Sequence, residues 1–448
     1  MKNSVFIHFI CLVLALTQCT QVQHNHEPIA VQISAETTRL LNTWYPRSVD
    51  ESAGGFFPVW TWNWENRDDG RKGIVTQARH TWSAAQASMR FPESPHLREA
   101  AENGYQFLRS VLWDSVYGGF YEYRGSNGKN HTIPGIDNTK RAYGNAFGIY
   151  ALSAYFELTA DTSALLLAQK AFYWLEGHAC DPEYGGYFNH LERNGSPVHL
   201  SLPPEKIGSD DGIGYKDYNS SIHILEAYTC LYRIWPDSLV KERLTDIFIR
   251  IRDVFVTGRG FLHLFFQADW NPVSYKDSSE TVRNEHLYFD HVSFGHDLET
   301  AYLLIEAAKA LELPETPALR SKTRLMVDHA VKYGWDNHHG GFFESAYYMK
   351  GDSLPAIVDS SKTWWVQAEG LNALLLMANR YPKDPKYRSY FEKQWQYIQT
   401  FLIDHQTGGW YSDGLDHDSK ARKYLKGHHW KACYHNLRAL LNCEEMLK

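Results

Sequence analysis

Two short segments of this chain carry a histidine followed three residues later by a glutamate: His223-Ile-Leu-Glu226 and His296-Asp-Leu-Glu299. Residues three apart share one face of a helix, so in a helical segment each glutamate can bind its own histidine. Because the pKa of an ordinary imidazole lies near neutral pH, such a histidine can take up or return a proton during a reaction. The two pairs are therefore candidates for acid/base catalysis.

A short sequence motif recurs along the chain, and its spacing accounts for the distance between these pairs. It consists of an aspartate, three variable residues, two glycines and an aromatic residue, and a degraded copy is Gly258-Arg259-Gly260-Phe261. Two successive glycines allow backbone angles that other residues avoid, so the motif predicts a tight hairpin. The copies divide the chain into six units of roughly seventy residues, which indicates a repeat architecture. The complete copies begin at Asp50, Asp114, Asp181, Asp336 and Asp404.

Apolar residues within each unit follow a helical period. In the second unit, one run covers residues 147–158 and another covers residues 164–175. Six such helix pairs bury their apolar faces if they close into a ring, with one inner and one outer helix per pair. The sequence thus predicts an all-α fold, an (α/α)6 barrel over residues 34–448, with an open helical solenoid as the competing shape. Segments 201–218 and 270–290 lack a period and are expected to form long loops at the mouth.

Closure of the ring would bring several reactive side chains to one axial cavity. His223 and His296 begin the inner helices of two middle units, 73 residues apart (296 minus 223). In four other units, counting 25 residues from the first glycine of the hairpin reaches the start of an inner helix. These four positions are Arg79, Tyr143, Trp365 and Cys433, the last of which lies two residues before His435.

Such a cavity suits a polar, uncharged substrate that carries a carbonyl group. Neutral histidines can move a proton, and an arginine can stabilise the negative oxygen of an enediolate. Tryptophan faces can stack on the apolar C–H patches of a sugar ring. The tryptophans expected at the mouth are Trp364, Trp365 and Trp430.

Composition and motif content argue against several other functions. The formal net charge of −7 gives no basic surface for nucleic acid. A di-iron bundle would need further glutamates from two other helices, and none stands at the equivalent places in the Arg79 and His435 units, so no metal or other cofactor is predicted. No phosphate loop or dinucleotide fingerprint is present. The scattered Cys180, Cys230 and Cys433, together with Cys443, are expected to be buried free thiols.

The N-terminus has the pattern of an export signal. Lys2 precedes an apolar run over residues 5–16, which is too short to span a bilayer. The run ends at Leu16-Thr-Gln-Cys19, which resembles a bacterial lipoprotein cleavage box. We therefore expect a signal peptide over residues 1–18, a tether over residues 19–33, a periplasmic location and Cys19 as the candidate site of lipidation.

Six motifs in order resemble the cellobiose 2-epimerases, which belong to the wider N-acylglucosamine 2-epimerase superfamily of (α/α)6 barrels. The resemblance covers most of the chain after the tether. It implies reversible epimerisation, without a cofactor, at C2 of the reducing-end sugar of a β-1,4-linked disaccharide, which interconverts glucose and mannose there. The motifs are Gln77-Ala-Arg79-His80-Thr-Trp82, Lys140-Arg-Ala-Tyr143-Gly-Asn145-Ala-Phe147, Asn219-Ser-Ser-Ile-His223-Ile-Leu-Glu226, Gly295-His296-Asp297-Leu-Glu299, Lys362-Thr-Trp364-Trp365-Val-Gln-Ala-Glu369 and Trp430-Lys-Ala-Cys-Tyr434-His435-Asn436.

The same resemblance implies a role for each matching residue. His296 and His435 would be the acid/base pair, and Arg79 and His223 would steady the carbonyl oxygen and assist ring opening. Either Trp364 or Trp365 would be the stacking residue of its motif. The remaining implied roles are orientation of the histidines by Glu226 and Glu299, and substrate binding by Tyr143, Asn145, Trp364, Trp365, Trp430 and Glu369.

Other functions stay open from the sequence alone. An aldose-ketose isomerase or an N-acylglucosamine 2-epimerase would share the chemistry. A glycoside hydrolase on the same barrel would need two carboxylates across a scissile bond, for which Asp297, Glu299, Glu226 and Glu369 are candidates. A non-catalytic sugar-binding lipoprotein would need only the tryptophans. The disaccharide and the oligomeric state are not determined by these motifs.

Overall fold

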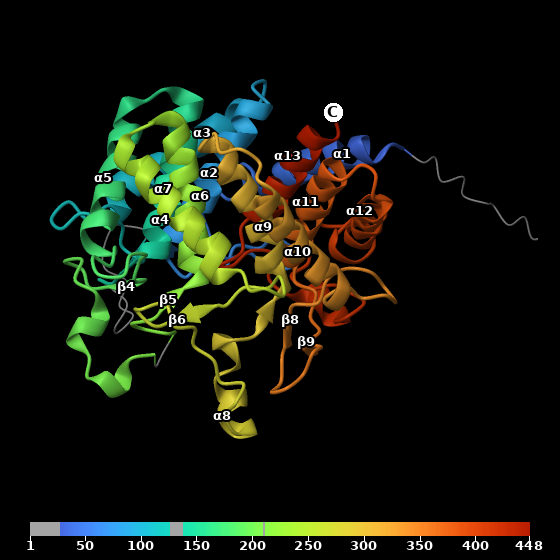
Figure 1. Ribbon diagram of the computed structural model, residues 1–448. Coiled ribbons are helices and arrows are strands. Elements are labelled where there is room, and N and C mark those ends of the chain that lie inside the picture. The colour runs from blue at the N-terminus through green and yellow to red at the C-terminus, as the bar shows by residue number, and fades with distance from the viewer. Residues whose placement is uncertain (1–26, 126–137, 209–210) are drawn as a thin grey trace, which may run out of the picture.

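The computed structural model describes residues 27–125, 138–208 and 211–448. Within these ranges the chain is a closed ring of paired helices, which confirms the predicted (α/α)6 barrel (Figure 1). The predicted signal peptide and Cys19 lie outside the described residues. Among the described helices, none is both long and apolar enough to cross a membrane.

Six helices form the inner ring and six the outer ring of the described chain. Consecutive inner helices contact one another around the whole circle, and the last inner helix also packs on the first. The inner helices are α2 (Ile74–Arg90), α4 (Ala142–Thr159), α6 (Tyr218–Ile234), α9 (Phe294–Ala310), α11 (Trp364–Arg380) and α13 (Tyr434–Met446). The outer helices are α1 (Ile29–Trp44), α3 (Pro95–Phe107), α5 (Thr162–His178), α7 (Ser238–Arg250), α10 (Pro317–Tyr333) and α12 (Pro385–Tyr397).

The outer partner of the last inner helix comes from the other end of the chain. α1 packs against α13, so the first and last helices together make one pair (Figure 1). α1 begins at Ile29, earlier than the barrel boundary expected at residue 34, because Ile33 is fully buried against the core. The expected tether therefore ends before residue 29.

Short antiparallel strand pairs join successive units on the side of the barrel where the inner helices begin. The strand just before an inner helix pairs with a strand that follows the next hairpin. In their described residues, the segments expected as loops contain the short helix α8 (Glu280–Glu285), short 3-10 turns, strand residues and the first residue of α6. The pairs are β1 (Arg71–Gly73) with β2 (Tyr123–Gly125), β3 (Lys140–Arg141) with β4 (His190–Leu191), β5 (Lys216–Asp217) with β6 (Phe265–Phe266), and β7 (Val292–Ser293) with β8 (Ser345–Tyr347), which also pairs with β9 (Ala356–Asp359).

Each complete hairpin is fixed by a buried lysine that the sequence did not reveal as a partner. The lysine lies just before the next inner helix, and its Nζ donates to the hairpin aspartate over 2.6 to 3.0 Å. In four of these units it also donates to the carbonyl of the first hairpin glycine. Each pair fixes the hairpin relative to the helix that carries the site residues. We call these residues the hairpin lysines: Lys72, Lys140, Lys216, Lys362 and Lys426.

The hairpin glycines are required both by backbone angle and by space, which can be tested at Gly119. Its φ is +72°, and an added Cβ would lie 2.6 Å from Cε2 of Trp174. A left-handed backbone alone costs a side-chain-bearing residue roughly 1–2 kcal/mol. We therefore expect Gly119→Ala to lower the free energy of unfolding by more than this amount.

Gly351 is the matched control because its φ is +80° but an added Cβ would meet open space. Gly351→Ala should cost only the backbone strain, and thermal unfolding of both variants measures the difference. Equal destabilisation of the two would show that Trp174 places no constraint on the hairpin.

The four described cysteines are free thiols. Cys433 and Cys443 are buried, whereas Cys180 and Cys230 are only half-buried. The prediction of free thiols is confirmed, and the prediction of full burial holds for two of the four.

Candidate active site

The beginnings of the inner helices bring the predicted residues together at two depths. Tyr143, Trp365 and His435 are the second residues of α4, α11 and α13. Arg79 and His223 lie one turn further along α2 and α6, so they reach the centre at a deeper level than the sequence count implied. His296 is near the start of α9 and is more exposed than the other two histidines.

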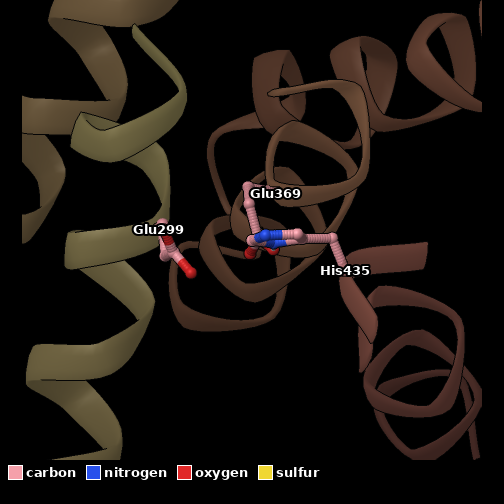
Figure 2. A group of neighbouring side chains, drawn as sticks. All are labelled: Glu299, Glu369 and His435. Atoms are coloured by element: carbon pink, nitrogen blue, oxygen red, sulfur yellow. The ribbon is translucent and has the colours of Figure 1, made fainter. Parts of the chain in front are cut away.

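His435 is held by a carboxylate from the neighbouring inner helix. Its Nδ1 lies 2.7 Å from Oε1 of Glu369, and Figure 2 shows the two side chains directed at one another. A carboxylate accepts hydrogen bonds, so the proton of the neutral imidazole resides on Nδ1 and leaves a lone pair on Nε2. Glu369 is therefore a positioning partner of His435, a role that the motif did not imply.

Arg438 is the centre of a buried network that joins three inner helices to α13. Its guanidinium donates to Glu226 and Glu299, and over 2.7 Å to Glu369. All four side chains are buried, with Arg438 only 2% exposed. Since an unpaired charge is costly to bury, one arginine makes it possible for three carboxylates to stand at the centre of the ring.

Glu226 binds His223, as the His-x-x-Glu pattern predicted, and it also binds Arg438. Its Oε2 lies 2.9 Å from Nδ1 of His223, and the hydroxyl of Tyr434 donates to Oε1 over 2.7 Å. Burial alone would raise the pKa of Glu226, but the charge of Arg438 and the hydrogen bond from His223 hold this pKa at about 2. Glu226 is therefore a permanent carboxylate.

The second His-x-x-Glu pair does not form. Glu299 binds Arg438 instead of His296, which corrects the prediction that it orients this histidine. His296 is held by two hydroxyls: the Ser293 Oγ lies 2.7 Å and the Tyr218 hydroxyl 3.1 Å from its Nδ1. The two candidate acid/base residues thus differ in their partners, since His435 faces a carboxylate and His296 faces neutral groups.

Trp365 lies beside both of these histidines. Its ring centroid is 4.5 Å from that of His296 and 5.9 Å from that of His435. Burial lowers the pKa of both imidazoles well below the ordinary 6.5, so at neutral pH the uncharged form is favoured at each. Neutral imidazoles are the form that can remove a proton.

Arg79 reaches the centre from α2, which lies between α13 and α4 in the inner ring. It donates from Nη2 to the Tyr143 hydroxyl over 2.9 Å and from Nη1 to the carbonyl of Trp430 over 2.7 Å. The Tyr143 ring in turn packs edge-on against His223, with centroids 5.2 Å apart. The Trp430 side chain is 43% exposed, consistent with its predicted place at the mouth.

Two predicted substrate contacts make other contacts. The Asn145 amide is fully buried and accepts from the backbone N–H of Phe120 over 2.7 Å, so it joins α4 to the preceding hairpin. Trp364 packs edge-on against His428, with centroids 5.6 Å apart, and Lys431 lies over its ring. Of the two adjacent tryptophans, Trp365 is therefore the one beside the histidine pair.

The carboxylates at the centre already have a cationic partner. Glu299, Glu369 and His435 offer atoms within 4.8 Å of one another, an arrangement that resembles a metal site. However, Nη2 of Arg438 binds both glutamates and supplies the positive charge that a metal ion would bring. Of the carboxylates considered for hydrolysis, Glu226, Glu299 and Glu369 each bind Arg438 through one oxygen, and Asp297 accepts from the backbone N–H of Leu262.

Sequence reasoning missed Arg438, although the signal was present. The segment His435-Asn-Leu-Arg438 has the same spacing of three as the His-x-x-Glu pairs, which places both side chains on one face of α13. Ser293 and Tyr218 carried no comparable signal, because their contact with His296 depends on the positions of the strands before two inner helices.

Comparison with known proteins agrees with this geometry and confirms the resemblance inferred from the motifs. Cellobiose 2-epimerase of Bacteroides fragilis is 28% identical over 415 residues, covering 92% of this chain and 96% of the relative. D-mannose isomerase of Marinomonas mediterranea is 25% identical and covers 93% of this chain and 96% of the relative. The solved structure of cellobiose 2-epimerase from Spirochaeta thermophila superposes with a TM-score of 0.79 at 29% identity, covering 94% of this chain and 96% of that one. Because the family model for N-acylglucosamine 2-epimerase (GlcNAc 2-epimerase) matches residues 55–439, this chain belongs to that family.

Proposed function

We propose that this protein reversibly epimerises C2 of the reducing-end sugar of a β-1,4-linked disaccharide, interconverting glucose and mannose. The observation that carries the proposal is the pair of imidazoles, His296 and His435, which both lie beside Trp365. Two proton-transfer groups from different helices are what inversion at one carbon needs, since the proton leaves one face and returns to the other. The similarity to cellobiose 2-epimerases over nine-tenths of the chain supports this reaction.

The proposed reaction begins when the sugar ring opens and frees the C1 aldehyde. One neutral imidazole removes the proton from C2, and the C–H electron pair forms a C1–C2 double bond while the negative charge moves to O1. Arg79 stabilises this enediolate oxygen. The other histidine, as imidazolium, then donates its proton to the opposite face of C2, and O1 becomes a carbonyl again.

The reaction needs one protonated and one neutral histidine. The different partners of the two histidines determine which of them carries the extra proton. A carboxylate stabilises an imidazolium, and Glu369 gives His435 this partner, whereas His296 has only hydroxyls. Although burial favours the uncharged form of both imidazoles in the free protein, the singly protonated form that the reaction needs therefore carries its proton on His435, so we assign His435 as the acid and His296 as the base. After each turnover the roles are exchanged, and solvent must restore the proton before the same direction can run again.

This assignment predicts the effect of Glu369→Gln, which keeps the shape of the side chain but removes its charge. A hydrogen bond to a charged group is worth about 1.5–3 kcal/mol. The loss corresponds to a decrease of about 10- to 100-fold in kcat. Steady-state kinetics with the disaccharide measures it, and Glu392→Gln, on the surface, is the control. A variant with unchanged kcat would contradict the proposed role of the carboxylate.

The reaction is tested by proton NMR of the purified protein with cellobiose and with β-1,4-mannobiose in deuterated water. The proposal expects signals of the C2 epimer with deuterium at C2. A ketose product would instead assign aldose-ketose isomerisation, the activity named for the Marinomonas mediterranea relative. Release of monosaccharides would assign hydrolysis, and unchanged spectra would overturn the proposed substrates.

We also propose that the protein is exported, with a lipid on Cys19. The support is the charged and apolar pattern of residues 2–16 together with the cysteine that follows. Mass spectrometry of the protein isolated from its native membranes tests this, and an unprocessed N-terminus would overturn it.

A further inference from the structure

One of the six hairpins lacks the buried ion pair that fixes the others. At the degraded hairpin, Thr257 occupies the position of the aspartate: its Oγ1 accepts from the backbone N–H groups of Arg259 and Phe261 as the aspartates accept within their own turns. Val292 occupies the position of the lysine, because it lies in β7 just before α9 as Lys216 lies in β5 just before α6. This unit has therefore lost both the cation and the anion.

A cavity of about 650 Å³ lies at this hairpin. Thr257, Gly258 and Arg259 form one wall, and residues of the long loop and of the β8–β9 connection form the others. None of the three site histidines, nor Arg79 or Trp365, lines it. The volume is within the range of small-molecule sites. We call it the fourth-unit cavity.

One wall of the fourth-unit cavity contains a carboxylate that three donors hold in place. Oδ2 of Asp290 accepts from Ser274 Oγ, from the backbone N–H of Tyr275 and from the Tyr347 hydroxyl, over 2.6 to 2.9 Å. These contacts fix Asp290 as an anionic part of the wall.

The charged groups around the cavity balance. Three cationic and three anionic side chains line it, and only one pair of them, Lys350 and Asp277, is in contact, at 3.4 Å. A balanced lining favours a neutral ligand whose groups can both donate and accept, and the hydroxyl is the group with this property. The six side chains are Arg259, Lys276, Lys350, Asp277, Asp290 and Asp352.

We propose that the fourth-unit cavity is a second carbohydrate site, which binds a short neutral oligosaccharide apart from the histidines. Hydroxyls of the sugar donate to the carboxylates of the lining, and neighbouring hydroxyls accept from its lysines. The site goes beyond the proposed epimerase function, because it needs none of the catalytic residues. Such a site would retain longer glycans on the protein while their ends are processed.

Gly258 offers a substitution that fills the cavity without straining the hairpin. Its φ lies outside the left-handed region, and an added Cβ would meet no atom within 4 Å. Gly177 has the same two properties but lies near the end of α5, outside the cavity. Gly258→Trp and Gly177→Trp are thus a matched pair, and Asp290→Asn is a second test that removes one charge of the lining without adding bulk.

The experiment measures the number of sugars bound per chain by calorimetry, with cellotriose and with β-1,4-mannotriose. All variants carry His435→Ala so that no substrate is converted. We expect the Gly258→Trp protein to bind one sugar fewer per chain than the Gly177→Trp protein, and Asp290→Asn to weaken that site on the order of tenfold or more. Equal numbers of bound sugars in the Gly258→Trp and Gly177→Trp proteins would overturn the proposal. The difference is independent of turnover, so it is informative even if the epimerase reaction is absent.

Discussion

Alanine at position 435 should lower kcat by about 10²- to 10⁴-fold, the usual contribution of a placed acid or base. The reason is that His435 supplies one of the two proton transfers at C2, and no other titratable side chain shares its place beside Trp365 and Glu369 in the described chain. Alanine at position 296 should have an effect of the same size. Steady-state rates with cellobiose and mannobiose measure both losses.

Deuterium exchange at C2 distinguishes the roles of the two histidines. Each single variant keeps one proton-transfer group, so it should still exchange the C2 proton of the epimer whose C2–H bond faces that group, without forming the other epimer. The two variants should therefore exchange different epimers. His338→Ala, at an exposed hairpin position, is the control and should be fully active. Normal epimerisation by either alanine variant would contradict the two-histidine mechanism.

Arg438→Met should be the most destabilising change at the centre of the ring. Removing the guanidinium leaves the carboxylates of Glu226, Glu299 and Glu369 close together without their shared cation. Breaking a buried ion pair from one side costs about 3–5 kcal/mol. The variant should also lose activity, since two of these glutamates hold His223 and His435. Thermal unfolding and kcat are the two measurements.

The destabilisation caused by Arg438→Met should change with pH in a definite direction. Burial raises the pKa of Glu369 above 4.5 even with the charge of Arg438 beside it. Without the arginine, the folded-state pKa of these carboxyls should rise further above their pKa in the unfolded chain. Groups shifted in this direction stabilise the fold at low pH and lose that contribution as pH rises through the folded pKa. The difference in Tm between variant and wild type should therefore be larger at pH 8 than at pH 5.

A surface arginine provides the comparison. Arg388 pairs with Glu392 on the exposed side of α12, and Arg388→Met should change stability by no more than about 1 kcal/mol. Arg438→Lys retains the charge but cannot reach all three carboxylates, so its stability should lie between those of wild type and Arg438→Met. An Arg438→Met protein as stable as the Arg388→Met protein would show that the network contributes nothing.

The barrel could be predicted from the sequence because its repeat is local. An aspartate, two glycines and an aromatic residue determine a hairpin within a few residues, and the apolar period between hairpins determines the helices. The same repeat places the three histidines at or near the starts of inner helices. What the repeat does not give is depth: Arg79 was expected at the start of its helix, as Tyr143 is, but it lies one turn further along.

The partners of the site residues depend on contacts across the ring. Glu299 is three residues from His296, yet the stronger attraction is to a guanidinium carried by α13. Glu369 contacts His435, which lies 66 positions further along the chain. No local pattern encodes such a choice, because it is determined by which charges meet once all six inner helices are in place.

The pairing of α1 with α13 has a consequence for the order in which the protein matures. During synthesis α1 leaves the ribosome before the other ring helices, but its inner partner α13 is the last of the ring helices to be made. His435 and Arg438 are both on α13, so Glu226, Glu299 and Glu369 have no shared cation until α13 has been made. A chain that stalls before α13 therefore lacks one of the two proposed acid/base histidines and the contacts that close the ring, so catalytic competence and ring closure are acquired in the same step.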